Sequence, residues 1–249
     1  MFNLIYSEFL KLRRTHIIPL IVLGAILIPF IQCFTIAAIC NACPDESLKM
    51  QTLKNSLMNI NLIQIPAVNT LIISLVASFI FIKEFTNKTN NVIYSYHISR
   101  MKIFIAKYIT IFILCSILYL INFIAIVLVI YIGYGIEGLN RIFIMQLEVN
   151  LSSLLLQIFE IPIVIFIASV SKNLIIPSVY SIISAFSGFL IFNSGIYMQL
   201  IPTMLPSIPV SRILQGDPID YIAVIITAVS TFVLFLFLCT WYWKKVDIQ

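Results

Sequence analysis

Glu160 is the residue whose type and position most strongly suggest chemistry, because it lies deep inside a long apolar run. An ionised carboxylate at the centre of a bilayer costs about 2.5 kcal/mol or more, so its side chain should face protein or water. It can line a transport route, attract a cationic substrate or carry a proton. It can equally hold helices together through Gln157, one turn earlier, or through a polar residue of another span such as Asn69 or Asn122.

The sequence contains no visible hydrolytic machinery. His16 and His97 are far along the chain from any paired acid or nucleophile, and no G-x-x-x-x-G-K-[ST] motif occurs that could cradle nucleotide phosphates. We therefore expect no catalytic residue and no cofactor bound by this chain. If ATP is used, another chain must supply its site.

Cys40 and Cys43 form a C-x-x-C pair at the end of the first apolar run. A small structural disulfide is one interpretation, since disulfides persist outside the cytosol. Two free thiols are another. One pair without a nearby histidine offers too few ligands for a metal ion, so we expect no metal.

Residues 83–107 form a polar, aromatic-bearing segment between two apolar runs, and they hold five of the fifteen Lys and Arg residues. A membrane protein that gathers so much positive charge in one connection presents that connection to a partner. We interpret the segment as a docking element. A basic loop held at the lipid surface is the alternative.

The elements that position these residues follow from composition: 61% of the residues are apolar and the mean hydropathy is +1.08. Soluble globular proteins are about 45–50% apolar, and a helix needs about 20 apolar residues to cross a bilayer. The sequence predicts an all-α polytopic membrane protein, with residues 1–249 forming one transmembrane domain of six helices. The predicted spans are 17–39, 62–82, 108–134, 151–170, 174–192 and 221–243.

An even number of spans puts both termini on one side of the membrane, and basic residues mark the cytoplasmic side. Four of the fifteen basic residues fall on the opposite side, namely Lys49, Lys54, Arg141 and Arg212. Both termini are therefore expected in the cytoplasm. The net charge of +5 reflects this topology and gives no reason to expect a nucleic-acid partner.

The N-terminal residues predict an amphipathic helix in the cytoplasmic interface. Apolar residues recur at spacings of three and four, with charged residues between them: Phe2, Ile5, Phe9 and Leu12 alternate with Glu8, Lys11 and Arg14. The apolar side is expected in the lipid boundary, with the bases near anionic head groups. A plain extension of the first span is the alternative.

The outer connections are predicted over residues 41–61, 135–150 and 193–220. The last contains Pro202, Pro206 and Pro209, which forbid one uninterrupted helix, so we expect a broken helical pair covered by protein. In the fifth span, small residues share one helical face: Ser178, Ser181, Ala185 and Gly188. This face is a candidate dimer seam, although packing within the subunit explains it as well.

The docking segment resembles the first cytoplasmic loop of type-2 ABC exporter permeases. An acidic-aromatic pair, Glu84-Phe85, is followed by a turn, a short apolar stretch and a Ser-Arg step, although Lys88 and His97 replace the usual Gly and Pro. The resemblance implies a short coupling helix that inserts into a separate ATPase. Its docking residues would be Glu84, Phe85, Val92, Ile93, Tyr96, His97, Arg100 and Lys102.

The opening residues 6–15 resemble the S-E-x-x-K-x-x-R-T start of lantibiotic-immunity and bacitracin-resistance permeases of Gram-positive bacteria. This resemblance implies a multi-pass permease of the bacterial cell membrane, surrounded by lipids, that expels a cationic antimicrobial peptide. Its partners would be an ATPase that binds ATP and Mg²⁺ and a second permease, identical or sibling. The outer acids Asp45, Glu46, Asp217 and Asp220 suit a cationic peptide.

Three rival functions stay open. The cargo of an ABC exporter could instead be sodium or a small antibiotic. The chain could be a proton-coupled secondary transporter that uses Glu160, which would work without an ATPase. It could also be a membrane scaffold without transport activity.

Overall fold

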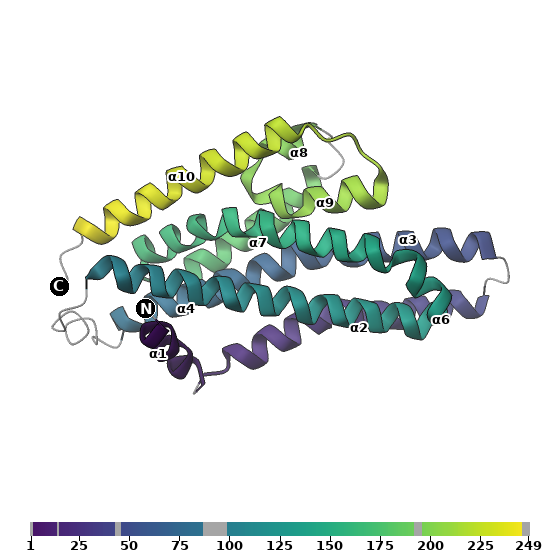
Figure 1. Cartoon of the computed structure of the whole chain (residues 1–249), viewed down its shortest axis with the longest axis horizontal. Helices are drawn as coiled ribbons and strands as arrows, with labels where there is room; N and C mark the ends of the chain where they lie inside the picture. The colour runs from purple at the N-terminus through teal and green to yellow at the C-terminus, as the bar shows by residue number, and fades with distance from the viewer. Residues whose placement is uncertain (1, 14, 43–45, 87–98, 192–195, 246–249) are drawn as a thin grey trace.

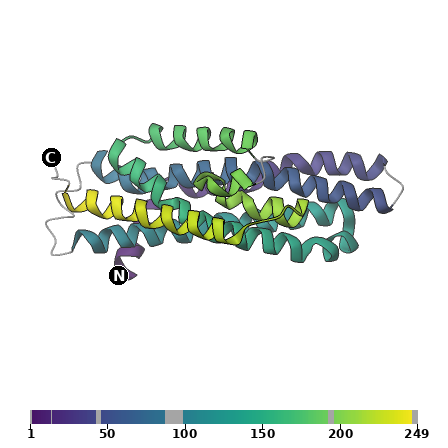
Figure 2. The same cartoon turned by 90° about the horizontal axis from the view of Figure 1, so that it is seen from above.

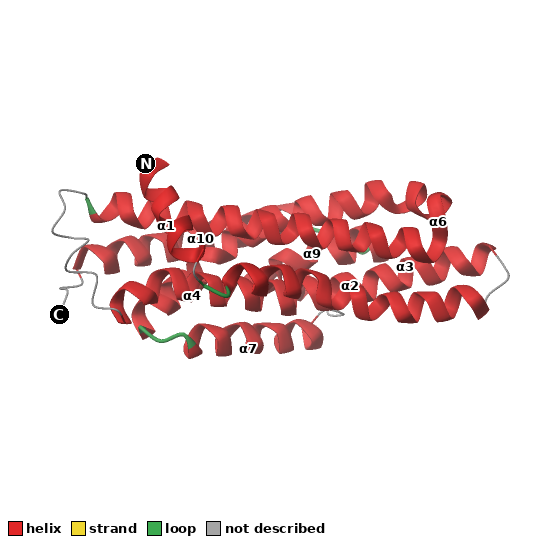
Figure 3. Cartoon of the chain, turned by 90° about the horizontal axis from the view of Figure 1, so that it is seen from below, coloured by secondary structure: helices red, strands yellow, loops and turns green. Residues whose placement is uncertain are grey.

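The computed structural model describes residues 2–13, 15–42, 46–86, 99–191 and 196–245. Within these ranges every regular element is a helix (Figure 3). The long helices run side by side along one axis and form an elongated bundle (Figure 1). The prediction of an all-α polytopic membrane protein is confirmed.

The helices follow the chain in a simple order. Their bounds are α1 Phe2–Arg13, α2 Ile17–Ala42, α3 Glu46–Ile63, η1 Gln64–Asn69, α4 Thr70–Thr86, α6 Arg100–Ser171, α7 Ile175–Ile191, α8 Ile196–Leu200, η3 Pro202–Ser207, α9 Ile208–Val210, η4 Ser211–Gln215 and α10 Tyr221–Lys245. Here η1 and η4 are π-helices and η3 is a 3₁₀-helix.

Five segments of the described chain are long and apolar enough to cross a membrane: Ile17–Ile36, Gln51–Lys83, Arg100–Ile136, Ile142–Ser171 and Tyr221–Trp243. The sixth predicted span corresponds to α7, which has 17 residues. That is the short end of the range of about 17–25 residues for a spanning helix. Figure 2 shows α7 along one face of the bundle.

Two of the expected outer loops are helical instead. α3 starts at Glu46 and α6 continues through residues 135–150, with its direction reversed at Gly135. Gly135 has a φ of 67°, which a residue without a side chain adopts at little cost. Hydropathy missed these helices because their polar residues look like a loop. Their apolar faces nevertheless pack together in one cluster: Ile36, Leu53, Leu57, Ile60, Ile126, Val129, Ile130 and Ile142.

The proline-rich stretch is broken into short helical pieces, as its prolines predict. Pro202 and Pro209 each occupy the first turn of a piece, where a missing N–H costs nothing. Met204, Leu205 and Ile208 are buried against α10. Protein therefore covers this irregular backbone, which is the condition for its presence at membrane depth.

α1 lies across the bundle axis, at the same end as the last turns of α10 (Figures 1 and 3). Leu12 of α1 and Trp243 of α10 belong to the main core cluster. The two ends of the described chain therefore meet at one end of the bundle, as an even number of spans requires. The cytoplasmic location of that end remains a prediction.

The helical nature of α1 is confirmed, but the expected orientation of its apolar face is wrong. Leu12 is buried and Phe9 packs against the main core, so this face contacts protein. The exposed face consists of Phe2, Tyr6 and Leu10. Because each helical face carried apolar residues, the sequence pattern alone did not identify the face that packs on the bundle.

Candidate functional site

A buried lysine joins three helices at the end of the bundle that holds α1. The side chain of Lys107 in α6 is fully buried, and its Nζ atom donates a hydrogen bond of 3.0 Å to the carbonyl oxygen of Ile80 in α4. The ammonium group also lies 5.3 Å from the ring centroid of Phe81 and 5.8 Å from that of Trp243. Aromatic faces attract a cation at such distances, and more strongly when water is excluded.

The aromatic rings around Lys107 also contact one another. The centroids of Phe81 and Trp243 are 5.5 Å apart at 84°, and Phe104 lies 5.8 Å from each of these rings. The indole Nε1 of Trp243 donates a hydrogen bond to the Ser169 hydroxyl. We call Lys107, Ile80, Phe81, Phe104 and Trp243 the Lys107 clamp. It ties α4, α10 and the first arm of α6 (residues 100–134) together, and the hydrogen bond from Trp243 to Ser169 adds the second arm (residues 136–171).

The clamp lies where the chain leaves and re-enters the bundle around the predicted docking segment. α4 ends at Thr86 and α6 starts at Arg100. Glu84 and Phe85 form part of the last turn of α4, whereas Arg100 and Lys102 are exposed in the first turn of α6. The remaining predicted docking residues lie outside the described residues: Val92, Ile93, Tyr96 and His97.

Lys107 was assigned to the polar connection in the sequence analysis, and this assignment is wrong. α6 begins seven residues before it, so Lys107 lies two turns inside the helix and is fully buried. A signal existed: Ile103, Lys107 and Ile111 are spaced by four and share the apolar face of α6. A lysine on such a face needs polar partners inside the protein.

A second polar group lies within the predicted spans. The Oε2 atom of Glu160 accepts a hydrogen bond of 2.7 Å from Gln157, and the Oε1 atom of Gln157 accepts one of 3.2 Å from the hydroxyl of Tyr119. All three side chains are buried. Tyr119 precedes Gly135 and Glu160 follows it, so the group links the two arms of α6. The Oε1 atom of Glu160 has no hydrogen-bond partner among the described residues.

The two asparagines considered as partners of Glu160 bond elsewhere. The Oδ1 atom of Asn69 accepts a hydrogen bond from Gln64, whose Nε2 atom also donates to the carbonyl oxygen of Gly24. Asn122 donates to the carbonyl oxygen of Ala25. Gln64 and Asn122 therefore donate to adjacent carbonyl groups of α2, and Asn69 accepts a bond from Gln64. Gln157, the nearest candidate in the sequence, forms the hydrogen bond.

The π-helix η1 is a feature that the sequence analysis did not identify. It spans Gln64–Asn69, contains Pro66, and buries both Gln64 and Asn69. Single π-turns often occur at functional sites, because they shift the side chains that follow them. Pro66 between two polar residues in an apolar run was the available signal.

The small residues of α7 have contacts inside this subunit. Ser74 in α4 donates a hydrogen bond of 3.0 Å to Ser181, and a Cβ atom at Gly188 would lie 2.9 Å from Met204 and 3.7 Å from Pro66. Ser178 and Ala185, in contrast, are partly exposed. Packing within the subunit therefore accounts for Ser181 and Gly188, and a dimer seam remains a prediction.

The predicted outer acids are distributed unevenly. Asp217 and Asp220 are exposed, and the Oδ1 atom of Asp220 accepts a hydrogen bond of 3.0 Å from the backbone of Ile222. Asp220 thus stabilises the start of α10. Glu46 starts α3, and Asp45 lies outside the described residues.

The predicted C-x-x-C pair is described only in part. Cys40 lies in the last turns of α2, and Cys43 lies outside the described residues.

Most of the chain matches a known family of proteins. Residues 4–188 match a family described as ABC-2 family transporter protein, which is well over half of the chain. The matched region includes most of α1, every clamp residue except Trp243, Glu160 and most of α7. A search of curated proteins found no match.

Proposed function

The chain belongs to the ABC-2 transporter permease family, and from that premise we propose that it is the membrane subunit of an ATP-driven exporter. ATP and Mg²⁺ bind to a separate cytosolic ATPase. A second permease, either another copy or a sibling chain, completes the assembly. The proposed cargo is a lantibiotic or another cationic antimicrobial peptide, which is removed from the membrane to give immunity or resistance.

The observation that carries the proposal is the position of the Lys107 clamp. Residues 87–98 connect α4 with α6 on the side where the clamp joins these helices. A force applied to this connection therefore reaches α4, α10 and both arms of α6 together. A coupling element requires that the helices on either side of it are firmly packed against the rest of the bundle. If they were loosely attached, the loop would move without moving the bundle.

The docking residues have a direct test. Arg100→Glu combined with Tyr96→Ala reverses one charge and removes one aromatic anchor, and we expect the purified permease to lose its ATPase. Lys172→Glu is a matched control, since Lys172 is also an exposed base at a helix end. If the double variant retains the ATPase, the assignment of the docking segment is wrong, although the family assignment stands.

The proposed orientation has a test of its own. In a chain whose native cysteines are replaced by serine, Lys102→Cys should react with an impermeant thiol reagent only after the cells are opened. Asp217→Cys should react in intact cells, because Asp217 is exposed in the opposite predicted connection. The reverse labelling pattern would contradict cytoplasmic termini.

The cargo is supported by the exposed acids Asp217 and Asp220, whose charge suits a cationic peptide. Deletion of the chain should sensitise cells to such peptides. Sensitivity to sodium or to a small antibiotic instead would identify another cargo for the same ATP-driven machinery.

The partly unsatisfied carboxyl group of Glu160 favours a second candidate, proton-coupled transport. An intramembrane acid that exchanges a proton is the usual basis of that mechanism. It predicts transport by the purified chain without any ATPase, abolished by Glu160→Gln. Transport that requires the ATPase and survives this substitution would exclude it.

A further inference from the structure

A basic cavity lies where α1 meets the end of α4. Its volume is about 820 Å³, and its described lining consists of Leu10, Lys11 and Arg13 from α1 and Lys83 from α4. Three of these four residues are cationic and none is acidic. The volume falls within the range of about 300–1,000 Å³ that is usual for ligand pockets. The cavity therefore has both the size and the charge to hold an anionic group.

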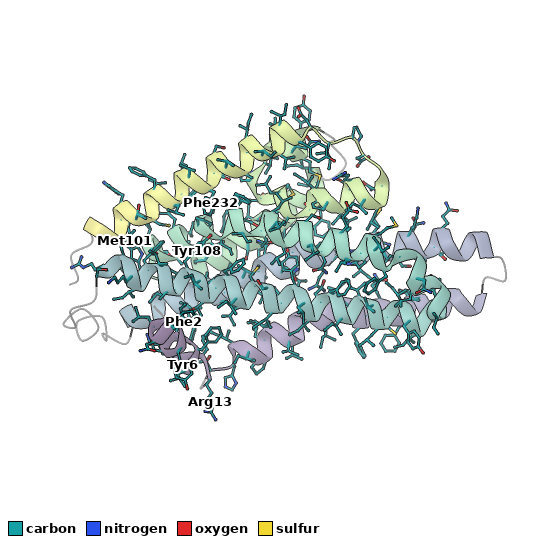
Figure 4. All side chains as sticks on the ribbon, in the orientation of Figure 1. Phe2, Tyr6, Arg13, Met101, Tyr108 and Phe232 are labelled. Atoms are coloured by element: carbon teal, nitrogen blue, oxygen red, sulfur yellow. The ribbon has the colours of Figure 1, made fainter. Side chains whose placement is uncertain are left out.

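The exposed face of α1 beside this cavity has the pattern of a lipid-contacting surface. α1 lies across the end of the bundle, and its exposed face carries Phe2 and Tyr6, which are 87% and 66% exposed (Figures 3 and 4). Leu10 and Arg13 continue the same face, because each is spaced by three or four residues from its neighbour on this face. An apolar face that ends in a base is typical of a helix lying at a membrane interface.

The outer face of α2 extends this apolar surface away from the cavity. Leu23, Phe30 and Phe34 are 69%, 60% and 66% exposed, and α2 begins four residues after Arg13. A ligand with a negative head and apolar tails would match both parts of the surface. The head would meet the three bases while the tails followed the exposed side chains of α2.

Local contacts fix two of the bases in the cavity wall. Lys11 forms an ion pair of 2.5 Å with Glu8, which lies on the buried side of α1. The ammonium group of Lys83 lies 4.6 Å above the ring of Phe79, one turn earlier in α4. Because Glu8 offsets part of the charge of Lys11, Lys11 should contribute less than Arg13 to the discrimination between anionic and neutral ligands.

We propose that this cavity binds the head group of an anionic phospholipid from the leaflet in which α1 lies. The lipid bridges α1 and the last turns of α4, so it contacts the helix that leads into the docking segment. This inference requires that the chain is inserted in a membrane, as its family membership implies. It does not depend on which cargo is transported. Basic pockets at the cytoplasmic side of membrane helices are suited to such head groups.

The test uses the full chain, purified in a mild detergent and titrated with phosphatidylglycerol or phosphatidylcholine. We expect tighter binding of phosphatidylglycerol, and a loss of about fivefold in its affinity for each base that is neutralised. Arg13→Gln and Lys83→Gln should each show this loss, and the double variant about the product of both. Binding of phosphatidylcholine should not change.

Two controls make the test decisive. Lys172→Gln removes an exposed base outside the cavity and should leave lipid binding unchanged, whereas Lys83→Arg keeps the charge and should retain it. If the double variant does not fold, the two single variants carry the test. Unchanged phosphatidylglycerol affinity in the Gln variants would overturn the proposal.

Two further outcomes would identify a different ligand and so overturn the proposal as well. Equal competition by inorganic phosphate would show a site for the free anion rather than for a lipid. Loss of the ATPase from the Gln variants, with unchanged lipid affinity, would show that the bases bind an acidic protein surface. This second outcome would leave the proposed export function intact.

Discussion

The ammonium group of Lys107 lies 3.0 Å from the carbonyl oxygen of Ile80, and both residues are buried. A charged side chain thus links the first arm of α6 to α4 within the protein interior. Burying a charge is costly unless it gains polar partners. The Lys107–Ile80 hydrogen bond forms only while α4 and α6 keep their relative position. The pair therefore resists separation of these two helices next to the docking segment.

Replacing Lys107 with Met should leave stability nearly unchanged and impair coupling. The lost charge-assisted hydrogen bond is worth about 1.5–3 kcal/mol, but the substitution also removes the cost of a buried ion. We expect a twofold to thirtyfold loss of ATP-driven transport, which corresponds to about 0.5–2 kcal/mol of coupling. Thermal unfolding and transport in proteoliposomes measure the two effects separately.

Lys54→Met serves as the control for this variant, because Lys54 is exposed in α3. It should change neither quantity. Normal transport by the Lys107→Met variant would show that the clamp only packs helices.

The spans were predictable because apolar run length is a direct physical requirement of the bilayer. The last predicted span, 221–243, matches α10 within two residues. The helical outer connections could not be predicted in the same way. Asn61 and Gln146 look like loop residues by hydropathy, yet both are fully buried and bond to each other. Their partners come from different helices, which a one-dimensional pattern does not reveal.

The polar sites were likewise predictable only in part. Gln157 was a predictable partner of Glu160, because residues three apart meet on one helical face. Tyr119, which is 38 residues from Gln157, was not predictable. Its position depends on the turn at Gly135 and on the rotation of two helical arms, and both are decided by tertiary packing.

The amide pair formed by Asn61 and Gln146 should contribute strongly to stability. The two side chains exchange hydrogen bonds of 2.9 Å and 3.2 Å between α3 and α6. Asn61→Leu leaves a buried amide without its partner, so we expect a loss of about 1–3 kcal/mol. Thermal unfolding of the single and double variants measures it. The double variant with Gln146→Leu should recover part of the loss, because no orphaned amide remains.

Asn59→Leu is the matched control, since Asn59 is exposed two residues earlier in α3. Its effect should stay within about 0.5 kcal/mol. Additive losses in the double variant would show that the two amides do not interact.

Substitutions at Glu160 should separate hydrogen bonding from charge. Glu160→Gln keeps an oxygen that can accept the bond from Gln157, so stability and ATP-driven transport should both be retained. Glu160→Leu removes that acceptor and should cost about 1–3 kcal/mol. Unfolding and transport assays on both variants test this. Loss of ATP-driven transport in a stable Glu160→Gln variant would show that the carboxyl group itself is needed.

Gly188 distinguishes internal packing from a dimer seam. A Cβ atom there would lie 2.9 Å from the Cε atom and 3.0 Å from the Sδ atom of Met204, so a larger side chain must displace η3 or the methionine. We expect Gly188→Val to destabilise the subunit by about 1–3 kcal/mol, the usual cost of overpacking.

Phe189→Val, at a half-exposed neighbouring position, should have a much smaller effect. Thermal unfolding measures these losses, and size-exclusion chromatography with light scattering reports the oligomeric state. If Gly188→Val instead leaves the unfolding temperature unchanged and converts a dimer into monomers, this face of α7 is an intersubunit surface and its packing against Met204 is secondary.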